Sequence, residues 1–130
     1  MPDLLIDLDN TIYSETEEIF SQIDLKMKSF ISSELNVSLE RAYNIQKRYF
    51  LKYGTTLRGL MVNHNIKPSF FLKYVHDINL KPIKKNLLLK SELKRFKGKK
   101  IIFTNGTTEH AINVLKRVGV LKEIDNIFDI

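Results

Sequence analysis

The sequence predicts an α/β protein built on a parallel sheet, with a long helical insertion after the first strand. Residues 4–8 and 101–104 are short apolar runs without helical spacing, which is typical of buried parallel strands. A basic helix over 84–97 precedes the second run and supplies the crossover that parallel strands require. The helical pattern before that helix is far longer than a crossover needs, so residues 15–80 are expected to form a separate helical domain.

Helical spacing and capping signals divide this insertion into elements. Apolar residues recur three and four positions apart in its first part, which indicates an amphipathic helix. Ser38 is placed to cap the second helix and Gly54 to end it, while Pro68 suits the first position of another. The expected helices span residues 15–34, 38–53, 56–64 and 68–77.

The remainder, residues 1–14 and 81–130, is expected to form the core around the sheet. Pro82 interrupts the helical pattern, and Gly98 is expected to end the basic 84–97 helix. Asn105 and Gly106 form a turn after the second strand, and a helix follows over 107–118. A third element is expected near the end of the sequence. The residues expected to line one side of the 84–97 helix are Leu87, Leu88, Leu89, Leu93 and Phe96.

Composition narrows the class of protein. With 130 residues, 43% of them hydrophobic, the sequence suits one soluble globular domain, and its lack of cysteine excludes disulfides and thiolate metal sites. No apolar run is long enough for a signal peptide or a membrane span, so a cytoplasmic location is expected. The net charge of +6 combines an acidic first 40 residues with a basic remainder. Nucleic-acid binding is one interpretation of that basic surface, but solvated lysines are favoured.

Two carboxylates follow the first strand. Asp7 and Asp9 are two positions apart, so both approach one crevice at the carboxyl end of the sheet. Neighbouring carboxylates commonly hold a divalent cation such as Mg²⁺. One of them could attack phosphorus while the other transfers protons, a mechanism that needs no serine, cysteine or histidine. The alternative is ordinary turn chemistry, which an isolated Asp-x-Asp would favour.

A second polar group follows the other strand. Thr104, Asn105 and Gly106 precede a helix start, where a hydroxyl and backbone N–H groups can bind phosphate. The alternative is a plain strand-to-helix turn in which Thr107 only caps the helix. Ligands bind at the carboxyl ends of parallel strands, so the two groups are expected to belong to one site. The histidines at positions 64, 76 and 110 show no metal-binding spacing and are interpreted as structural.

These motifs resemble those of the haloacid dehalogenase superfamily of phosphohydrolases. Residues 7–13, Asp-Leu-Asp-Asn-Thr-Ile-Tyr, resemble its first motif, and Phe-Thr-Asn-Gly at 103–106 resembles its second. The helical insertion is similar to a C1 cap, and residues 53–60 and 110–119 are similar to the pyrimidine 5′-nucleotidase branch.

The resemblance implies roles for particular residues. Asp7 would be the nucleophile and a Mg²⁺ ligand, and Asp9 the general acid/base with its backbone carbonyl on the metal. Thr104, Asn105 and Gly106 would bind the phosphate, and Arg58 of the cap would help to close over the substrate. A small phosphorylated molecule, such as a nucleoside monophosphate, is the expected substrate.

The sequence also departs from the family pattern. The lysine of the third motif and the acidic pair of the fourth cannot be placed, so the chain resembles a phosphohydrolase truncated before them. Three hypotheses follow: a phosphohydrolase, an inactive fragment or binding module, and a basic nucleic-acid binder. An incomplete sheet is also expected to expose an apolar edge that favours self-association.

Overall fold

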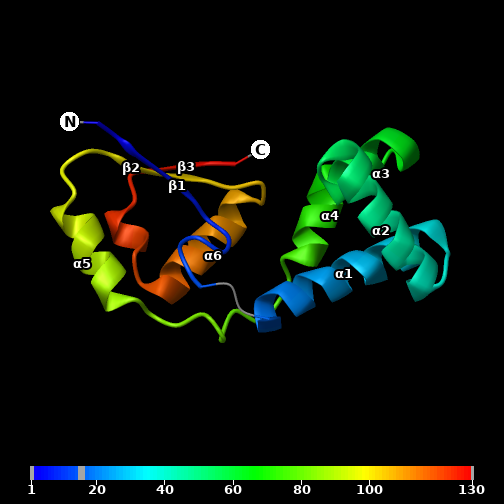
Figure 1. Cartoon of the computed structure of the whole chain (residues 1–130), viewed down its shortest axis with the longest axis horizontal. Coiled ribbons are helices and arrows are strands. Elements are labelled where there is room, and N and C mark those ends of the chain that lie inside the picture. Colours follow the sequence, from blue (N-terminus) through cyan, green and yellow to red (C-terminus); the bar gives the residue numbers. More distant parts are fainter. Residues whose placement is uncertain (1, 15–16, 130) are drawn as a thin grey trace. The chain divides into compact units, whose positions relative to one another are not determined.

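A computed structural model describes residues 2–14 and 17–129, and the chain divides into two compact units. The sheet unit comprises Met1–Phe20 and Asn79–Ile130, and the helical unit comprises Ser21–Ile78 (Figure 1). No helix among the described residues has the length and apolarity needed to cross a membrane.

The sheet unit is built on a parallel sheet with the strand order β1-β2-β3. Both apolar runs form strands, β1 (Leu4–Asp7) and β2 (Lys100–Phe103), and the third expected element is β3 (Asn126–Phe128). Asp7 is paired with Phe103, and Phe103 with Phe128, so the three strands end at the same edge. The α/β class with a parallel sheet is confirmed.

Helices cover one side of this sheet. α5 (Leu87–Arg95), α6 (Thr108–Val118) and the short 3-10 helix η1 (Leu121–Glu123) follow in the sheet unit, and Figure 1 shows α5 and α6 on the same side of the strands. Thr107 caps α6, because its hydroxyl accepts a hydrogen bond from the His110 N–H at 3.0 Å. The buried residues of this layer include Leu8, Ile102, Ala111, Val114, Leu115 and Val118.

The other face of the sheet is exposed within the described part of the chain, which corrects the expectation of buried strands. Leu5 is 59% exposed, Phe103 45% and Phe128 51%, whereas Ile102 is fully buried. Successive side chains alternate between the two faces of a strand, so a sheet with helices on one side buries only every second residue. The Phe103 and Phe128 rings stack on this open face with their centroids 5.8 Å apart.

The predicted 84–97 helix is also shorter than expected. The Asn86 side chain accepts a hydrogen bond from the Leu89 N–H at 3.0 Å, so α5 begins at Leu87 and ends at Arg95. Leu87 and Leu88 are 76% and 73% exposed, and Leu93 is the buried residue of the helix. Helical spacing shows which residues share a side of a helix but not whether another element covers them.

The helical unit follows the predicted pattern closely. Its caps are confirmed: the Ser38 hydroxyl accepts a hydrogen bond from the Arg41 N–H, Gly54 has a φ of 88°, and Pro68 opens the last helix. The expected start at residue 15 lies outside the described residues, and the last helix ends two residues early. The helices are α1 (Glu17–Leu35), α2 (Leu39–Tyr53), α3 (Thr56–His64) and α4 (Pro68–Val75).

The helical unit has its own hydrophobic core. Phe30 of α1 packs edge-to-face on Phe71 of α4, with ring centroids 5.2 Å apart. α3 approaches α2 closely at Gly59, where an added Cβ would overlap the Tyr49 side chain. Only glycine fits this contact without displacing the tyrosine. The core residues are Phe30, Ile31, Ala42, Ile45, Tyr49, Leu60, Phe71 and Val75.

Candidate active site

The carboxyl ends of the parallel strands form a pocket in the sheet unit. Because β1 and β2 are adjacent and parallel, Asp7 and Thr104 reach the same edge of the sheet. The pocket has a volume of about 360 Å³, and three of the predicted site residues are on its wall. Its lining residues are Asp7, Phe103, Thr104, Asn105, Phe128 and Asp129.

Asp7 is exposed at the point where β1 turns. The turn closes because the N–H groups of Thr11 and Ile12 both donate to the Leu8 carbonyl, at 3.3 and 3.0 Å. Asn10 takes the left-handed conformation at φ 61°, which asparagine tolerates better than most residues. The Thr11 hydroxyl then lies 3.2 Å from Asp7 Oδ2 and donates to it. The turn therefore holds the Asp7 carboxylate at the solvent boundary.

Thr104 is 5% exposed, and both its backbone N–H and its hydroxyl form hydrogen bonds. Its N–H donates to the Phe128 carbonyl at 3.0 Å, which links the end of β2 to β3. Its hydroxyl accepts a hydrogen bond from the buried Gly106 N–H at 2.9 Å. The Gly106 amide is thus engaged within the turn, while Asn105 is exposed on the pocket wall.

Asp129 is a pocket residue that the sequence analysis did not select. Its Oδ2 accepts hydrogen bonds from the N–H and the hydroxyl of Thr108, at 3.2 and 2.7 Å, so it lies at the N-terminus of α6. A carboxylate is stabilised there by the positive end of the helix dipole. Its position in the sequence could have indicated this role, because Asp129 directly follows β3 as Thr104 directly follows β2.

Asp9 is held outside that pocket wall. Its Oδ1 accepts a hydrogen bond from the Tyr13 hydroxyl at 3.0 Å and lies 3.0 Å from His110 Nε2. Burial and the neighbouring Asp9 carboxylate raise the pKa of the Tyr13 phenol far above its usual value. The His110 side chain is only 2% exposed. The interpretation of this histidine as merely structural overlooked its contact with Asp9, because the two are distant in sequence.

The charges of the pocket bear on the predicted Mg²⁺. Asp7 and Asp129 carry negative charge, and the described lining contains neither lysine nor arginine. An oxygen-only donor set of this kind fits Mg²⁺, which commonly uses one or two carboxylates and completes its shell with water and phosphate. Within residues 2–14 and 17–129, no group of three or more acidic or histidine side chains is arranged to hold a metal. Asp7 and Asp129 therefore supply oxygen donors of the kind that Mg²⁺ uses.

Arg58 belongs to the helical unit, unlike the other predicted site residues. It is exposed near the start of α3, where its backbone N–H donates to the Thr55 hydroxyl at 3.1 Å. That hydrogen bond caps the helix and fixes the backbone of Arg58.

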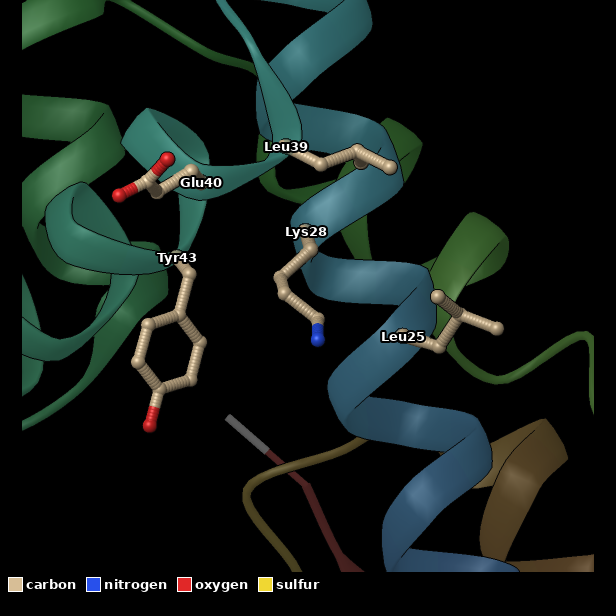
Figure 2. A pocket seen from close by; sticks show the side chains of 5 residues that line it. All are labelled: Leu25, Lys28, Leu39, Glu40 and Tyr43. Carbon is tan, nitrogen blue, oxygen red and sulfur yellow. The ribbon is translucent and has the colours of Figure 1, made fainter.

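The helical unit has a hollow of its own, with a volume of about 370 Å³. Figure 2 shows the Tyr43 ring of α2 beside the Lys28 side chain of α1, and Lys28 Nζ lies 5.4 Å from the ring centroid. Lys47 Nζ lies 5.3 Å from the same centroid. Both lysines also approach Asp24, at 3.6 and 3.5 Å. Since Asp24 offsets their charge, and no predicted site residue lines the hollow, it is not a candidate for the phosphate site.

The curated proteins that are similar to this chain include the following two. The chain is 26% identical over 131 residues to "Phosphate metabolism protein 8" of Saccharomyces cerevisiae, covering 93% of this chain and 41% of that protein. It is also 26% identical over 145 residues to "Glyceraldehyde 3-phosphate phosphatase" of Methanocaldococcus jannaschii, covering 95% of this chain and 60% of that protein. The chain thus spans about half the length of these relatives. No protein-family profile matches the sequence.

A solved structure shares the fold. The crystal structure of the putative HAD-hydrolase YfnB from Bacillus subtilis, bound to magnesium, matches with a TM-score of 0.51 at 16% identity. The match covers 98% of this chain and 64% of that one. The chain therefore shares the fold of this HAD-hydrolase structure and is similar in sequence to two proteins whose names refer to phosphate.

Proposed function

We propose that the chain hydrolyses a small phosphate monoester through an aspartyl-phosphate on Asp7. The observation that carries this proposal is the pocket in which Asp7, from the end of β1, meets Thr104 and Asn105, from the end of β2. A nucleophile beside hydroxyl and amide groups is the arrangement that phosphoryl transfer needs, because its catalysis depends on positioning and charge stabilisation. Two relatives whose names refer to phosphate chemistry support the same class.

Each step uses residues of this chain. An Asp7 oxygen forms a bond to phosphorus as the ester P–O bond breaks, and Asp9 gives its proton to the departing oxygen. Asp9 then takes a proton from water, whose oxygen bonds to phosphorus and releases phosphate from Asp7. Thr104 and Asn105 contact the phosphate oxygens, and the Gly106 N–H, which donates to the Thr104 hydroxyl, keeps the turn in shape.

Mg²⁺ belongs to this proposal, held by the Asp7 carboxylate and the Asp9 backbone carbonyl. When bound, it supplies positive charge that offsets the phosphate and the carboxylates. The need for that charge is clear from the described pocket wall, which carries two carboxylates and no basic side chain.

The helical unit is proposed to be a C1 cap, with Arg58 as its contribution to substrate binding. A nucleoside monophosphate is the proposed substrate, on the resemblance of residues 53–60 and 110–119 to the pyrimidine 5′-nucleotidase branch. The cysteine-free composition supports a cytoplasmic location.

The test is phosphate release by the purified chain from pyrimidine and purine nucleoside monophosphates and from p-nitrophenyl phosphate. We expect release that requires Mg²⁺, that chelation reduces to background, and that is faster with a nucleoside monophosphate than with p-nitrophenyl phosphate. Equal rates with and without Mg²⁺ would contradict the metal's role.

A second candidate, a binding module without turnover, is favoured by the lack of a basic side chain on the described pocket wall. It predicts that a folded chain binds a nucleoside monophosphate, measured by calorimetry, and releases no phosphate. Mg²⁺-dependent turnover excludes it.

Self-association of the sheet unit is also part of the proposal. β1 is an outer strand of the described sheet, and Leu5 is 59% exposed on its open face. Such strands pair readily with another copy of the chain. Sedimentation velocity over a concentration series is expected to show a dimer that Leu5→Lys weakens. Leu51→Lys, at a residue 83% exposed in the helical unit, is expected to leave the dimer intact. A monomer at every concentration contradicts this expectation.

A further inference from the structure

The Asp9 carboxylate is tied to two separate parts of the sheet unit. Tyr13, four residues later, donates from its hydroxyl to Asp9 Oδ1 at 3.0 Å. His110, 101 positions later in the chain, places its Nε2 3.0 Å from the same oxygen. When Asp9 is ionised, its carboxylate only accepts hydrogen bonds, so His110 Nε2 is then the donor in this contact. One oxygen of Asp9 is therefore held by both a local and a distant partner.

Burial makes the distant partner rigid. The His110 side chain is 2% exposed, whereas that of Asp9 is 36% exposed. His110 lies in the first turn of α6, where its own N–H donates to the capping hydroxyl of Thr107 at 3.0 Å. The cap fixes the backbone and the core fixes the ring, so the imidazole presents Nε2 in one direction. The Asp9 side chain is thus accessible to solvent, whereas the His110 side chain that contacts it is buried.

We propose that His110, together with Tyr13, is a positioning residue that holds the Asp9 side chain in the orientation needed for proton transfer. The inference rests on the proposed function, in which Asp9 is the acid/base. The His110 side chain is 2% exposed and that of Asp9 is 36% exposed, so His110 acts through Asp9 and not on the substrate. A misplacement of about 1 Å in a reacting group can cost about a hundredfold in rate.

Variants at His110 separate positioning from packing. His110→Gln keeps an N–H donor near the place of Nε2, whereas His110→Leu removes it and keeps an apolar side chain. We expect His110→Leu to lower kcat by about 10- to 100-fold with KM nearly unchanged, and His110→Gln to recover most of the loss. Tyr13→Phe is expected to lower kcat by a smaller factor, because the histidine contact remains. Equal losses in the Leu and Gln variants overturn the proposal.

His64→Leu is the matched control. The Nε2 atom of His64 lies 2.7 Å from the Tyr49 hydroxyl oxygen, so this histidine also contacts a side-chain oxygen. It belongs to the helical unit, whereas His110 belongs to the sheet unit. Its loss is expected to leave kcat unchanged. Thermal melts of all variants show whether each is folded, and kinetic comparisons are made only below the melting temperature of the least stable one.

An activity-independent measurement distinguishes failure of this inference from failure of the proposed function. NMR couplings between Hα and the two Hβ protons of Asp9 report how many side-chain rotamers it visits. We expect a single rotamer in the unmodified chain and in His110→Gln, and averaging between rotamers in His110→Leu. If the chain releases no phosphate, the proposed function fails, and this NMR result alone decides whether His110 positions Asp9. An Asp9 rotamer unaffected by His110→Leu overturns the inference, with or without activity.

Discussion

Asp7→Asn is expected to abolish Mg²⁺-dependent phosphate release, with a loss of at least about a thousandfold. An amide does not attack phosphorus as a carboxylate does, so no aspartyl-phosphate forms. Asparagine has nearly the same shape, and its carbonyl oxygen can still accept the hydrogen bond that the Thr11 hydroxyl gives to Asp7. The turn is therefore expected to survive, and the loss to be chemical. The measurement is phosphate release from a nucleoside monophosphate, with circular dichroism to confirm folding.

Asp3→Asn is the control for that experiment. Asp3 is another exposed aspartate of the sheet unit, and its Oδ1 accepts a hydrogen bond from the Lys99 N–H at 3.3 Å. The substitution removes the same charge from the same unit but at a residue outside the pocket, so the rate is expected to stay the same. Full activity in Asp7→Asn, or an equal loss in both variants, would exclude Asp7 as the nucleophile.

The second large effect is on stability. Phe71→Ala is expected to cost about 3–5 kcal/mol in the free energy of unfolding of the helical unit, because it leaves a cavity in a packed core. Phe71 is 2% exposed and packs edge-to-face on Phe30. Domains of ordinary stability have only about 5–15 kcal/mol, so much of the unit's stability depends on this ring. Urea unfolding followed by circular dichroism measures the loss.

Phe70→Ala is the matched control, since it makes the same change one position earlier in α4. Phe70 is 64% exposed, and its loss is expected to change the unfolding free energy by about 0.5 kcal/mol or less. Similar costs for the two substitutions would contradict the packing of α4 described above. The pair also tests a point that sequence alone left open, because Phe70 and Phe71 are adjacent and equally hydrophobic.

Local signals in the sequence were reliable. Ser38 and Thr107 cap the predicted helices, and Pro68 opens another, because a cap depends on residues within one turn of the chain. Asn86 is also a capping residue, and it begins the helix later than the predicted residue 84. Leu87 and Leu88 show the limit of hydrophobic spacing, since they share an apolar side that no described element covers.

The sequence by itself determined the α/β class, the two strand ends with Asp7 and Thr104, and the resemblance to haloacid dehalogenase phosphohydrolases, because these depend on short contiguous patterns. Only the tertiary structure decided which side of the sheet is open, that Asp129 joins the pocket, and that His110 holds Asp9. Each of these depends on contacts between segments distant along the chain. Asp9 and His110 are 101 positions apart, and it is the placement of α6 on one side of the sheet (Figure 1) that brings a buried imidazole to the carboxylate.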